Sequence, residues 1–314
     1  MAPAMAAAAS AELVTVAGRD GDRARAFAIR NGVAQSHGSA QALIDDPGID
    51  AVYIATPVAS HAPLAIAAAR AGKDVLVEKP MALDVAEADA MVAAAASGGR
   101  KLAVCFYQRG NLRHREVRRL IGADVIGRAT AARVAFSGRS RPRPGAWRFD
   151  PAQGGGVFAD QGSHAVDLLR YVLQDEVVDV AALTGTLAEA ADVEDTASVL
   201  LRFARGTQAI IMAHWSIEDP SPERTSVLEI SGTEATLVTW PLHDKFSRGT
   251  LVLAGRNGQR EIPIEETSTH VALLDAFAAK SWPPEVATGA DGAAAMRVQA
   301  AVYAAAQHAR SVGV

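Results

Sequence analysis

The chain has 314 residues, 49% of them hydrophobic, and a formal net charge of -4 at pH 7. At roughly 150 residues per domain, this length predicts two domains, and the acidic balance argues against a general nucleic-acid-binding surface. The single cysteine, Cys105, excludes an intrachain disulfide and favours a reducing compartment. No apolar run approaches the roughly 20 residues of a membrane span, and the N-terminus lacks the basic start of a signal peptide. We therefore expect a cytoplasmic protein that binds neither nucleic acid nor membrane.

The first third of the chain alternates short apolar strands with helices. The expected strands are 12–17, 51–55, 74–77 and 101–106, and the expected helices are 22–31, 40–45, 60–71 and 85–95. Near-continuous apolar strands that alternate with helices are typical of a parallel sheet covered on both faces. This part of the chain predicts a doubly wound α/β domain.

The remainder of the chain has a different pattern. Alternating apolar and polar residues predict strands at 129–137, 177–185, 197–203, 207–215, 226–231, 235–240 and 250–254. Helices are expected only at 113–121, 162–173, 269–280 and 293–312. Because few helices separate the strands, this part predicts an α+β domain with a large, mostly antiparallel sheet.

Three residues suggest a chemistry. Lys79 follows the apolar strand at 74–77, and the carboxyl ends of parallel strands are where such sheets bind ligands. Asp160 and His164 are four residues apart, so on a helix they share one face and the carboxylate can orient the imidazole. Hydride transfer from a secondary alcohol needs a charge to stabilise the alkoxide and a base for the hydroxyl proton. From position alone, a solvated turn lysine is an equally acceptable interpretation of Lys79. From spacing alone, an N-cap aspartate and a satisfied buried histidine are the favoured interpretation of Asp160 and His164.

An ordered set of short motifs carries a family resemblance. The set comprises Ala55-Thr56-Pro57, Ser60-His61, Ala71-Gly72-Lys73, Glu78-Lys79-Pro80, Tyr107-Gln108-Arg109, Trp147-Arg148, Gly154-Gly155-Gly156, Asp160 to His164, Val193-Glu194-Asp195-Thr196 and Asp291-Gly292. In this order and spacing the chain resembles the Gfo/Idh/MocA family, the relatives of glucose-fructose oxidoreductase and inositol dehydrogenase. The resemblance implies a dinucleotide-binding Rossmann domain over residues 1–107. It also implies a substrate-binding and oligomerisation domain with an open-faced sheet over residues 108–314.

The resemblance implies an NAD(P)-dependent oxidoreductase that transfers a hydride between a nicotinamide cofactor and a secondary alcohol of a sugar, cyclitol or related polyol. By the same resemblance, Lys79 contacts the substrate hydroxyl and the nicotinamide ribose, His164 is the acid-base group, and Asp160 orients the His164 imidazole. The predicted cofactor-binding residues are Gly18, Arg19, Asp20, Thr56, Pro57, His61, Glu78 and Lys79. The predicted substrate-binding residues are Arg109, Trp147, Arg148, Asp167 and Asp195. The structural alternatives are core packing for Trp147, a surface ion pair for Arg148, a helix cap for Asp167 and a turn for Asp195.

The end of the strand at 12–17 bears on cofactor choice. NAD-preferring folds place Asp or Glu there to bind the ribose 2′-hydroxyl, whereas this chain has Gly18-Arg19-Asp20. Arg19 can meet a 2′-phosphate with a charge-assisted fork. We therefore predict NADP in preference to NAD; the alternative is that Asp20 binds the ribose.

One departure from the family is the absent glycine turn. The family opens with a strand and a G-x-G-x-x-G turn that cradles the pyrophosphate, and this sequence contains no such motif. The first strand of a doubly wound sheet is central, so its loss leaves a gap between two buried strands. Our interpretation is a misassigned start codon or a truncation. The alternative is a non-catalytic sensor or partner-binding protein on the same fold that has lost dinucleotide binding.

Metal binding and assembly complete the expectations. The eight histidines are scattered, with no H-x-x-x-H pair and no cysteine partner, so we predict no metal site. The run Gly154-Gly155-Gly156 does not follow an apolar strand; it permits close backbone approach rather than phosphate binding. An open apolar sheet face must be covered, which predicts a homodimer or homotetramer.

Overall fold

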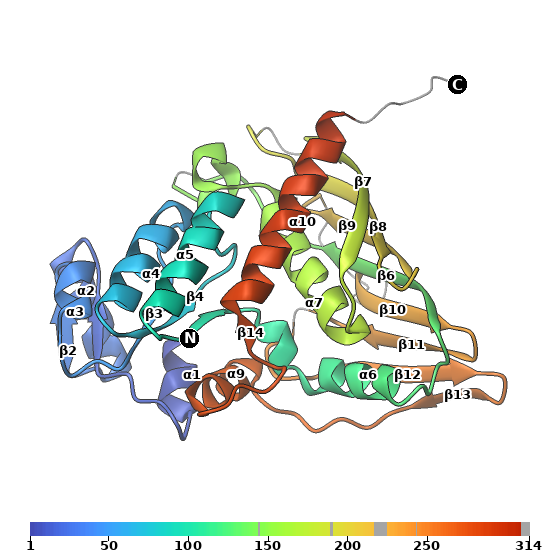
Figure 1. Cartoon of the computed structure of the whole chain (residues 1–314), viewed down its shortest axis with the longest axis horizontal. Helices are drawn as coiled ribbons and strands as arrows, with labels where there is room; N and C mark the ends of the chain where they lie inside the picture. The colour runs from blue at the N-terminus through green and yellow to red at the C-terminus, as the bar shows by residue number, and fades with distance from the viewer. Residues whose placement is uncertain (144, 189–190, 217–224, 243, 309–314) are drawn as a thin grey trace. The chain divides into compact units, whose positions relative to one another are not determined.

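The computed structural model describes residues 1–143, 145–188, 191–216, 225–242 and 244–308 (Figure 1). The chain forms two compact units. Unit 1 comprises Met1–Tyr107 and His270–Ala293, and unit 2 comprises Gln108–Thr269 and Ala294–Val314. The sequence predicts a boundary at residue 107 and one domain over 108–314, whereas the structure groups 270–293 with the first unit.

Unit 1 contains two sheets that are not hydrogen-bonded to each other. One pairs β1 (Thr15–Ala17) with β2 (Gln35–His37) in parallel. The other has the order β14-β5-β4-β3, with β3 (Ala51–Ile54), β4 (Asp74–Val77) and β5 (Leu102–Val104) parallel and β14 (Ala287–Thr288) antiparallel to β5. The helices of this unit are α1 (Ala2–Ala7), α2 (Gly21–Asn31), α3 (Ala40–Ile44), α4 (His61–Arg70), α5 (Val85–Ser97) and α9 (Thr269–Ala278), the last starting at the unit boundary.

The second sheet of unit 1 is buried on both faces. Its central strand β4 carries Val75, Leu76 and Val77, all of which are inaccessible to solvent or nearly so. Leu76 packs in a cluster with Leu273 and Leu274 of α9, while α4 and α5 pack against each other beside the strands (Figure 1). Apolar side chains on both faces explain why these strands are continuous apolar runs in the sequence.

The two sheets of unit 1 are separated between β1 and β3. Among the described strands, β1 is hydrogen-bonded only to β2, and β3 only to β4. The hydroxyl of Thr15 on β1 is buried without a hydrogen-bond partner in the described part of the chain. This arrangement matches the expected gap between the strands predicted at 12–17 and 51–55.

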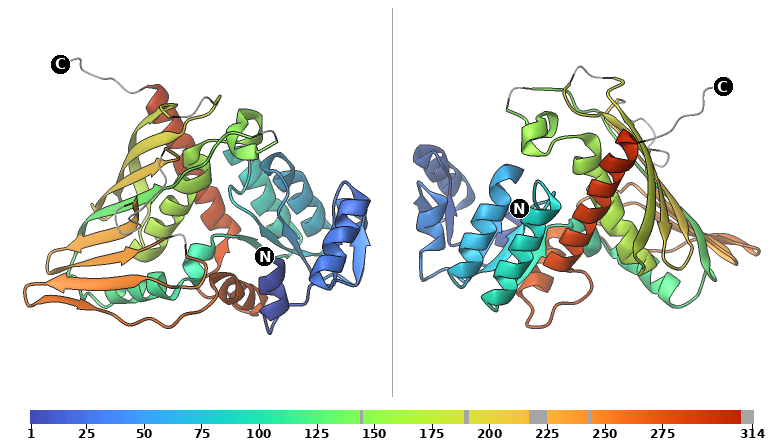
Figure 2. Two further views of the ribbon diagram at one scale, coloured as in Figure 1. Left: turned by 180° about the vertical axis from the view of Figure 1, so that it is seen from behind. Right: turned by 45° about the horizontal axis from the view of Figure 1, so that its top comes forward.

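Unit 2 is built on one eight-stranded sheet of order β13-β12-β11-β10-β6-β9-β8-β7 (Figure 2). The strands are β6 (Ala129–Ser137), β7 (Val177–Gly185), β8 (Thr196–Phe203), β9 (Gln208–His214), β10 (Ser226–Gly232), β11 (Ala235–Trp240), β12 (Thr250–Gly255) and β13 (Gly258–Glu261). All neighbours are antiparallel except β6 and β9, which are parallel. The predicted open sheet, mostly antiparallel, is confirmed.

Helices cover one face of this sheet (Figure 2). They are α6 (Leu112–Gly122), α7 (Ser163–Leu173) and α10 (Gly289–Gln307), of which the residues from Ala294 onward belong to unit 2. Every residue of α7 is buried. Short turns connect these elements: η2 (Tyr107–Gly110), η3 (Trp147–Phe149), η4 (Pro151–Gln153) and the π-helical turn η5 (Phe158–Gly162), which runs directly into α7.

The other sheet face carries exposed apolar side chains. Leu183 of β7, Leu200 of β8 and Ile210 and Met212 of β9 are about half exposed or more. Leu200 and Ile210 are direct cross-strand partners, and Ser198 lies opposite both Leu183 and Met212, so the four apolar side chains share this face. Among the residues that the structure describes, none of the helices has the length and apolar character needed to span a bilayer.

Candidate functional site

Loops at the ends of three strands gather the candidate residues of unit 1. β3 leads into Thr56 and Pro57, β4 into Glu78 and Lys79, and β5 into Cys105. Because the three strands are parallel, their carboxyl ends lie at one edge of the sheet, and ligands of such sheets bind at this edge. Lys79 is half-buried there. The sequence prediction of a lysine at a strand's carboxyl end is thus confirmed.

His61 links two of these loops. Its Nδ1 lies 3.0 Å from the Pro80 carbonyl oxygen, and its Nε2 lies 2.8 Å from the Thr56 carbonyl oxygen. The side chain is 1% exposed. The imidazole therefore holds the loop after β3 against the loop that carries Lys79. A direct contact between His61 and a cofactor stays a prediction.

The Glu78 carboxylate anchors the Lys79 loop from within the unit. It accepts hydrogen bonds from the Tyr53 hydroxyl and, at 3.2 Å, from the Lys79 backbone N–H. Burial raises the pKa of both Tyr53 and Cys105, and the Glu78 charge raises it further. Both groups therefore stay protonated as donors beside the carboxylate. This arrangement uses Glu78 to position its neighbour, and a contact with the cofactor stays a prediction.

The predicted ribose-binding residues lie between β1 and α2. The Gly18 N–H donates to the His37 carbonyl oxygen at 3.3 Å. Asp20 caps α2: its Oδ1 accepts from the N–H groups of Asp22 and Arg23 at 3.1 and 3.0 Å. Arg19 is exposed. The cap explains where α2 begins, while the cofactor contacts of Gly18, Arg19 and Asp20 stay predictions.

Asp160 and His164 lie at the start of one buried helix in unit 2. Asp160 is in the π-helical turn η5 and His164 in the first turn of α7, and they are 7% and 6% exposed. The helix therefore begins four residues before the predicted start at 162, and both side chains lie in its first turns. Single π-helical turns within α-helices occur frequently at functional sites.

Two predicted substrate-binding residues lie beside Asp160. The Arg148 Nε donates to Asp160 Oδ2 at 2.7 Å, and the guanidinium lies over the Trp147 ring at 5.2 Å from its centroid. Close backbone packing allows this, because a Cβ on Gly155 would lie 2.6 Å from the Arg148 carbonyl oxygen. The glycine run thus permits a backbone approach, as predicted. Asp160 has an ion-pair partner in addition to the predicted His164.

Arg109 and Asp167 form a buried ion pair. Arg109 Nε and Nη2 both donate to the Asp167 carboxylate, with a shortest distance of 2.7 Å. Their side chains are 5% and 1% exposed, and the guanidinium also lies over the ring of Tyr171. The pair joins η2 to α7. Substrate contacts of Arg109 and Asp167 stay predictions.

Asp195 organises a turn. Its carboxylate accepts from the N–H groups of Leu187 and Ala188 at 2.9 and 2.8 Å and from the Thr196 hydroxyl at 2.9 Å. The residue is fully buried. This is the turn role that the sequence left open, and a contact with substrate stays a prediction.

Sequence reasoning missed two polar residues near Asp160 and His164. The Glu194 carboxylate accepts from the Phe158 N–H at 3.0 Å and from the Tyr303 hydroxyl at 2.9 Å. Glu194 belongs to a recognised motif, so its position was a usable signal. Tyr303 lies in an Ala-rich helix, α10, whose sequence gave no signal of a functional residue.

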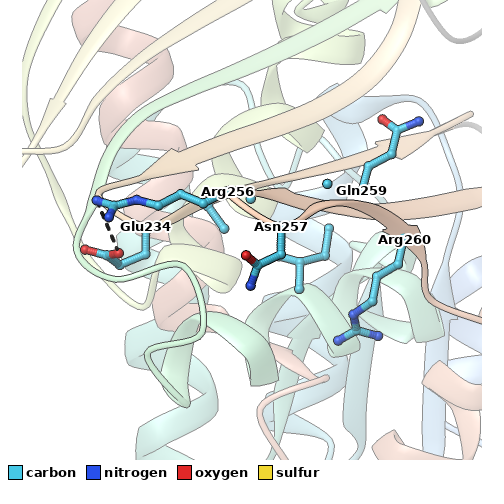
Figure 3. Close-up of a pocket in the computed structure, with 9 residues that line it drawn as sticks. Glu234, Arg256, Asn257, Gln259 and Arg260 are labelled. Atoms are coloured by element: carbon cyan, nitrogen blue, oxygen red, sulfur yellow. Dashed lines mark ion pairs between the residues drawn. The ribbon is translucent and has the colours of Figure 1, made fainter.

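A surface hollow of unit 2 lies away from these residues. Its volume is about 390 Å³, and it sits at the hairpin between β12 and β13. Glu234 and Arg256 form an ion pair across it at 4.0 Å (Figure 3). No predicted site residue lines it. Within the described ranges, no three histidine, cysteine or acidic side chains gather as metal ligands.

Comparisons with known proteins place the chain in a family. A profile described as "Oxidoreductase family, NAD-binding Rossmann fold" matches residues 1–106, and the GFO/IDH/MocA C-terminal domain matches residues 114–238. The 1,5-anhydro-D-fructose reductase of Ensifer adhaerens is 32% identical over 94% of this chain and 89% of the relative. The myo-inositol 2-dehydrogenase of Thermotoga maritima is 27% identical over 93% of this chain and 87% of the relative.

Solved structures agree with these relatives. An aldose-aldose oxidoreductase from Caulobacter crescentus, complexed with glycerol, has a TM-score of 0.87 and 26% identity over 99% of this chain and 94% of that one. A levoglucosan dehydrogenase, in complex with NADH and levoglucosan, has a TM-score of 0.87 and 25% identity over 98% of this chain and 93% of that one. Fold and comparisons together define an oxidoreductase with an NAD-binding Rossmann domain. The chain belongs to the GFO/IDH/MocA family.

The sequence predictions of family, fold class and enzyme class are confirmed. The alternative of a non-catalytic sensor finds no support in the comparisons. Some of the residues present suit the binding of a nicotinamide dinucleotide. Thr56, Glu78 and Lys79 lie at the carboxyl edge of the parallel sheet, where such ligands bind, and the Thr15 hydroxyl on β1 is buried without a hydrogen-bond partner. The turn that would hold the pyrophosphate has no counterpart in this sequence.

Proposed function

We propose that the chain is an NAD(P)-dependent dehydrogenase or reductase acting on a secondary alcohol of a sugar, cyclitol or related polyol. One observation carries this proposal: Lys79 lies at the carboxyl edge of a parallel sheet, in a loop fixed by Glu78 and His61. The paired positions of Asp160 and His164 at the start of a buried helix support it. The names of the relatives, which include reductases and dehydrogenases of sugars and an inositol, support the substrate class.

In the proposed chemistry, one residue stabilises charge and another transfers the proton. The bound nicotinamide supplies the hydride acceptor or donor. In the direction of oxidation, a ring nitrogen of His164 accepts the hydroxyl proton, and the Lys79 ammonium stabilises the negative charge that develops on the oxygen. In the direction of reduction, His164 returns the proton. The Asp160 carboxylate orients the imidazole, and its ion pair with Arg148 holds that carboxylate in place.

The finer assignments of substrate contacts belong to the same proposal. Trp147 and Arg148 would contact the polyol, because their segment lies directly beside Asp160 and Arg148 is 41% exposed. Arg109, Asp167 and Asp195 each make buried contacts with other groups of unit 2. They would therefore affect substrate binding by holding these groups in position. We propose residues 1–107 as the cofactor domain and 108–314 as the substrate and oligomerisation domain.

For the cofactor we propose NADP in preference to NAD. Arg19 is an exposed cation at the end of β1, and the Asp20 Oδ1 is engaged by the first amides of α2. Both features favour a phosphate over a free ribose hydroxyl. Arg19→Ala should lower kcat/KM for NADP about tenfold and for NAD less than about twofold. Equal efficiency of the wild type with both cofactors would contradict the preference.

For assembly we propose a cytoplasmic homodimer or homotetramer. The strip of Leu183, Leu200, Ile210 and Met212 is an apolar sheet face that water disfavours. Light scattering on Ile210→Lys should give a smaller species than the wild type, whereas Arg202→Lys, an exposed change on the same face, should not. A wild type that is monomeric at all concentrations contradicts this proposal.

The function is tested by cofactor binding and turnover. Fluorescence titration with NADPH and NADH comes first, followed by turnover with a panel of polyols and their ketones that includes myo-inositol, levoglucosan and 1,5-anhydro-D-fructose. Lys79→Ala and His164→Ala should each lower kcat at least about 100-fold. The exposed residues Lys280 and His308 provide matched controls, and their alanine variants should keep wild-type turnover. Near-wild-type turnover of Lys79→Ala or His164→Ala would refute the roles, and cofactor binding without turnover of any polyol or ketone of the panel would refute the function.

A further inference from the structure

The helix that carries Asp160 and His164 is capped by a residue from a distant part of the sequence. The first N–H groups of a helix have no partner within the helix itself. Here the Val157 N–H donates to the Glu194 carbonyl oxygen, and the Phe158 N–H to the Glu194 carboxylate, both at 3.0 Å. One residue thus binds two successive amides of the first turn. An anionic group at this end also interacts favourably with the helix dipole.

A tyrosine from α10 completes this cap. The Tyr303 hydroxyl donates to Glu194 Oε1 at 2.9 Å, and the Ala159 N–H in turn bonds to the tyrosine oxygen. The rings of Tyr303 and Phe158 meet edge to face, with centroids 6.2 Å apart. Glu194 and Tyr303, which we call the Glu194–Tyr303 clamp, therefore bind the amides of three consecutive residues just ahead of Asp160.

Two glycines make room for the clamp. A Cβ on Gly156 would lie 2.4 Å from the Glu194 carboxylate oxygens, and Gly156 has φ +123°, which side chains rarely adopt. A Cβ on Gly162 would lie 2.2 Å from the Phe158 ring. Because Gly156 and Gly162 have no side chains, the Glu194 carboxylate can reach the helix end and the Phe158 ring can lie across the π-helical turn. The local sequence is thus adapted to this contact.

Glu194 and Tyr303 are both partly buried, and this burial acts on both side chains. Burial raises the pKa of Glu194, while the Phe158 N–H and the Tyr303 hydroxyl oppose this shift. Burial, and then the Glu194 carboxylate, raise the pKa of Tyr303, so its hydroxyl stays a donor. A buried carboxylate is costly unless hydrogen bonds satisfy it. One donor that satisfies it, the Phe158 N–H, belongs to the helix that presents Asp160 and His164, and the other, the Tyr303 hydroxyl, belongs to α10.

We propose that Glu194 and Tyr303 are positioning residues that set the orientation of Asp160 and His164, without touching substrate or cofactor. The inference rests on the proposed function, in which His164 moves the hydroxyl proton. The first turn is held at Val157, Phe158 and Ala159 by the clamp, and Asp160 and His164 follow within the next two turns. A small displacement of this turn moves the imidazole relative to the reacting oxygen.

Kinetics of conservative variants test this inference. Tyr303→Phe keeps the ring and removes two hydrogen bonds, the one donated to Glu194 and the one accepted from the Ala159 N–H, so kcat should fall about tenfold while KM for the polyol changes less than about twofold. Glu194→Gln keeps an acceptor oxygen for the Phe158 N–H and should lose less than Glu194→Leu, which keeps none. Cofactor affinity, measured by NADPH fluorescence, should be unchanged in all three. Tyr171→Phe, the same change on a buried tyrosine of α7, is the matched control and should keep wild-type kcat.

A readout independent of turnover separates this inference from the proposed function. NMR titration of the His164 imidazole, assigned with His164→Gln, should show a shifted titration curve in Tyr303→Phe and Glu194→Gln, but not in Tyr171→Phe. A wild type without turnover refutes the proposed function, and the titration still tests the clamp. If the variants lose only thermal stability, with kcat and the His164 titration as in the wild type, the clamp is merely structural and the inference is wrong.

Discussion

A buried cation of unit 1 and one of unit 2 are bound by different kinds of partner. In unit 1 the partners are main-chain carbonyls: Lys73 Nζ donates to the Asp46 and Ile49 carbonyl oxygens at 2.7 and 2.6 Å, and His61 lies between two others. In unit 2 the Arg109 guanidinium binds the carboxylate of Asp167, 58 positions further along the chain. In unit 1, the positions of the candidate residues follow from the backbone topology. In unit 2 they depend on specific pairs of side chains.

The largest expected effect tests whether residues from both units act on one chemical step. Lys79→Ala and His164→Ala should each lower kcat about 100- to 1,000-fold, because each removes a group used in the transition state. Groups that act as a unit give strongly non-additive losses. The double variant should therefore be only slightly slower than the worse single variant. Losses that multiply across the two sites, measured by steady-state kinetics at saturating substrate, would show that the residues act independently.

The second prediction compares buried cations of the two units. Arg109→Met leaves the Asp167 carboxylate buried without its partner, so the free energy of unfolding should fall by about 3–5 kcal/mol. Lys73→Met leaves only carbonyl groups short of a donor, and the loss should be about 1–3 kcal/mol. Equilibrium urea unfolding measures both. The double variant Arg109→Met/Asp167→Leu should recover most of the loss, and an equally unstable double variant would contradict the ion-pair account.

The third prediction uses a buried histidine of unit 2. The His114 Nδ1 lies 2.9 Å from the Gln108 carbonyl oxygen, and burial, with Arg113 adding to it, lowers the pKa of His114 to about 3. The folded pKa is below the unfolded one, so between pH 6.5 and 3 the unfolded chain binds a proton that the folded chain excludes. Stability from this group is complete above pH 6.5 and falls by about 1.4 kcal/mol per unit as the pH drops.

Urea unfolding between pH 7 and pH 4 measures this slope. Other groups titrate in the same range, so the informative quantity is the difference between the wild type and His114→Gln. The variant should depend less steeply on pH by about 1 kcal/mol per unit below pH 6. Parallel curves for the two proteins would exclude His114 as the source.

The smallest expected effect concerns the cap of α2 in unit 1. Asp20→Ala removes the acceptor for two helix amides and should lower stability by about 1 kcal/mol, whereas Asp20→Asn should be nearly neutral. If Asp20 also binds a ribose, both variants should weaken NADH binding. Fluorescence titration on the two variants separates these roles, because the asparagine keeps the cap and loses the charge.

Sequence patterns predicted the long regular elements well and the short polar ones poorly. The buried strands of unit 1 are continuous apolar runs, and β8 alternates buried and exposed residues as its sequence does. The strands β2, β13 and β14 were missed: β13 is four exposed residues and β14 only two. Such strands exist because a neighbour pairs with them, and a local pattern does not contain that neighbour.

The candidate site divides in the same way. Lys79 could be placed from its strand, because the edge at which a parallel strand ends follows from local sequence. The Arg109–Asp167 and Glu194–Tyr303 pairs join residues 58 and 109 positions apart in the sequence. The early start of the helix at η5 had the same cause, since its first amides are bound by Glu194 rather than by a residue next to the helix.

The contribution of residues 270–293 to unit 1 has a consequence for synthesis. β14 extends the sheet beside β5, and Leu273 and Leu274 of α9 cover Leu76 and Ala103. Roughly 160 residues separate Tyr107 from this segment, which a ribosome takes about 10 to 30 s to translate. During that interval the nascent sheet has an unpaired edge and an uncovered apolar face. Unit 2 can fold most of its strands in this time, so the unit encoded first is the one whose sheet is completed later.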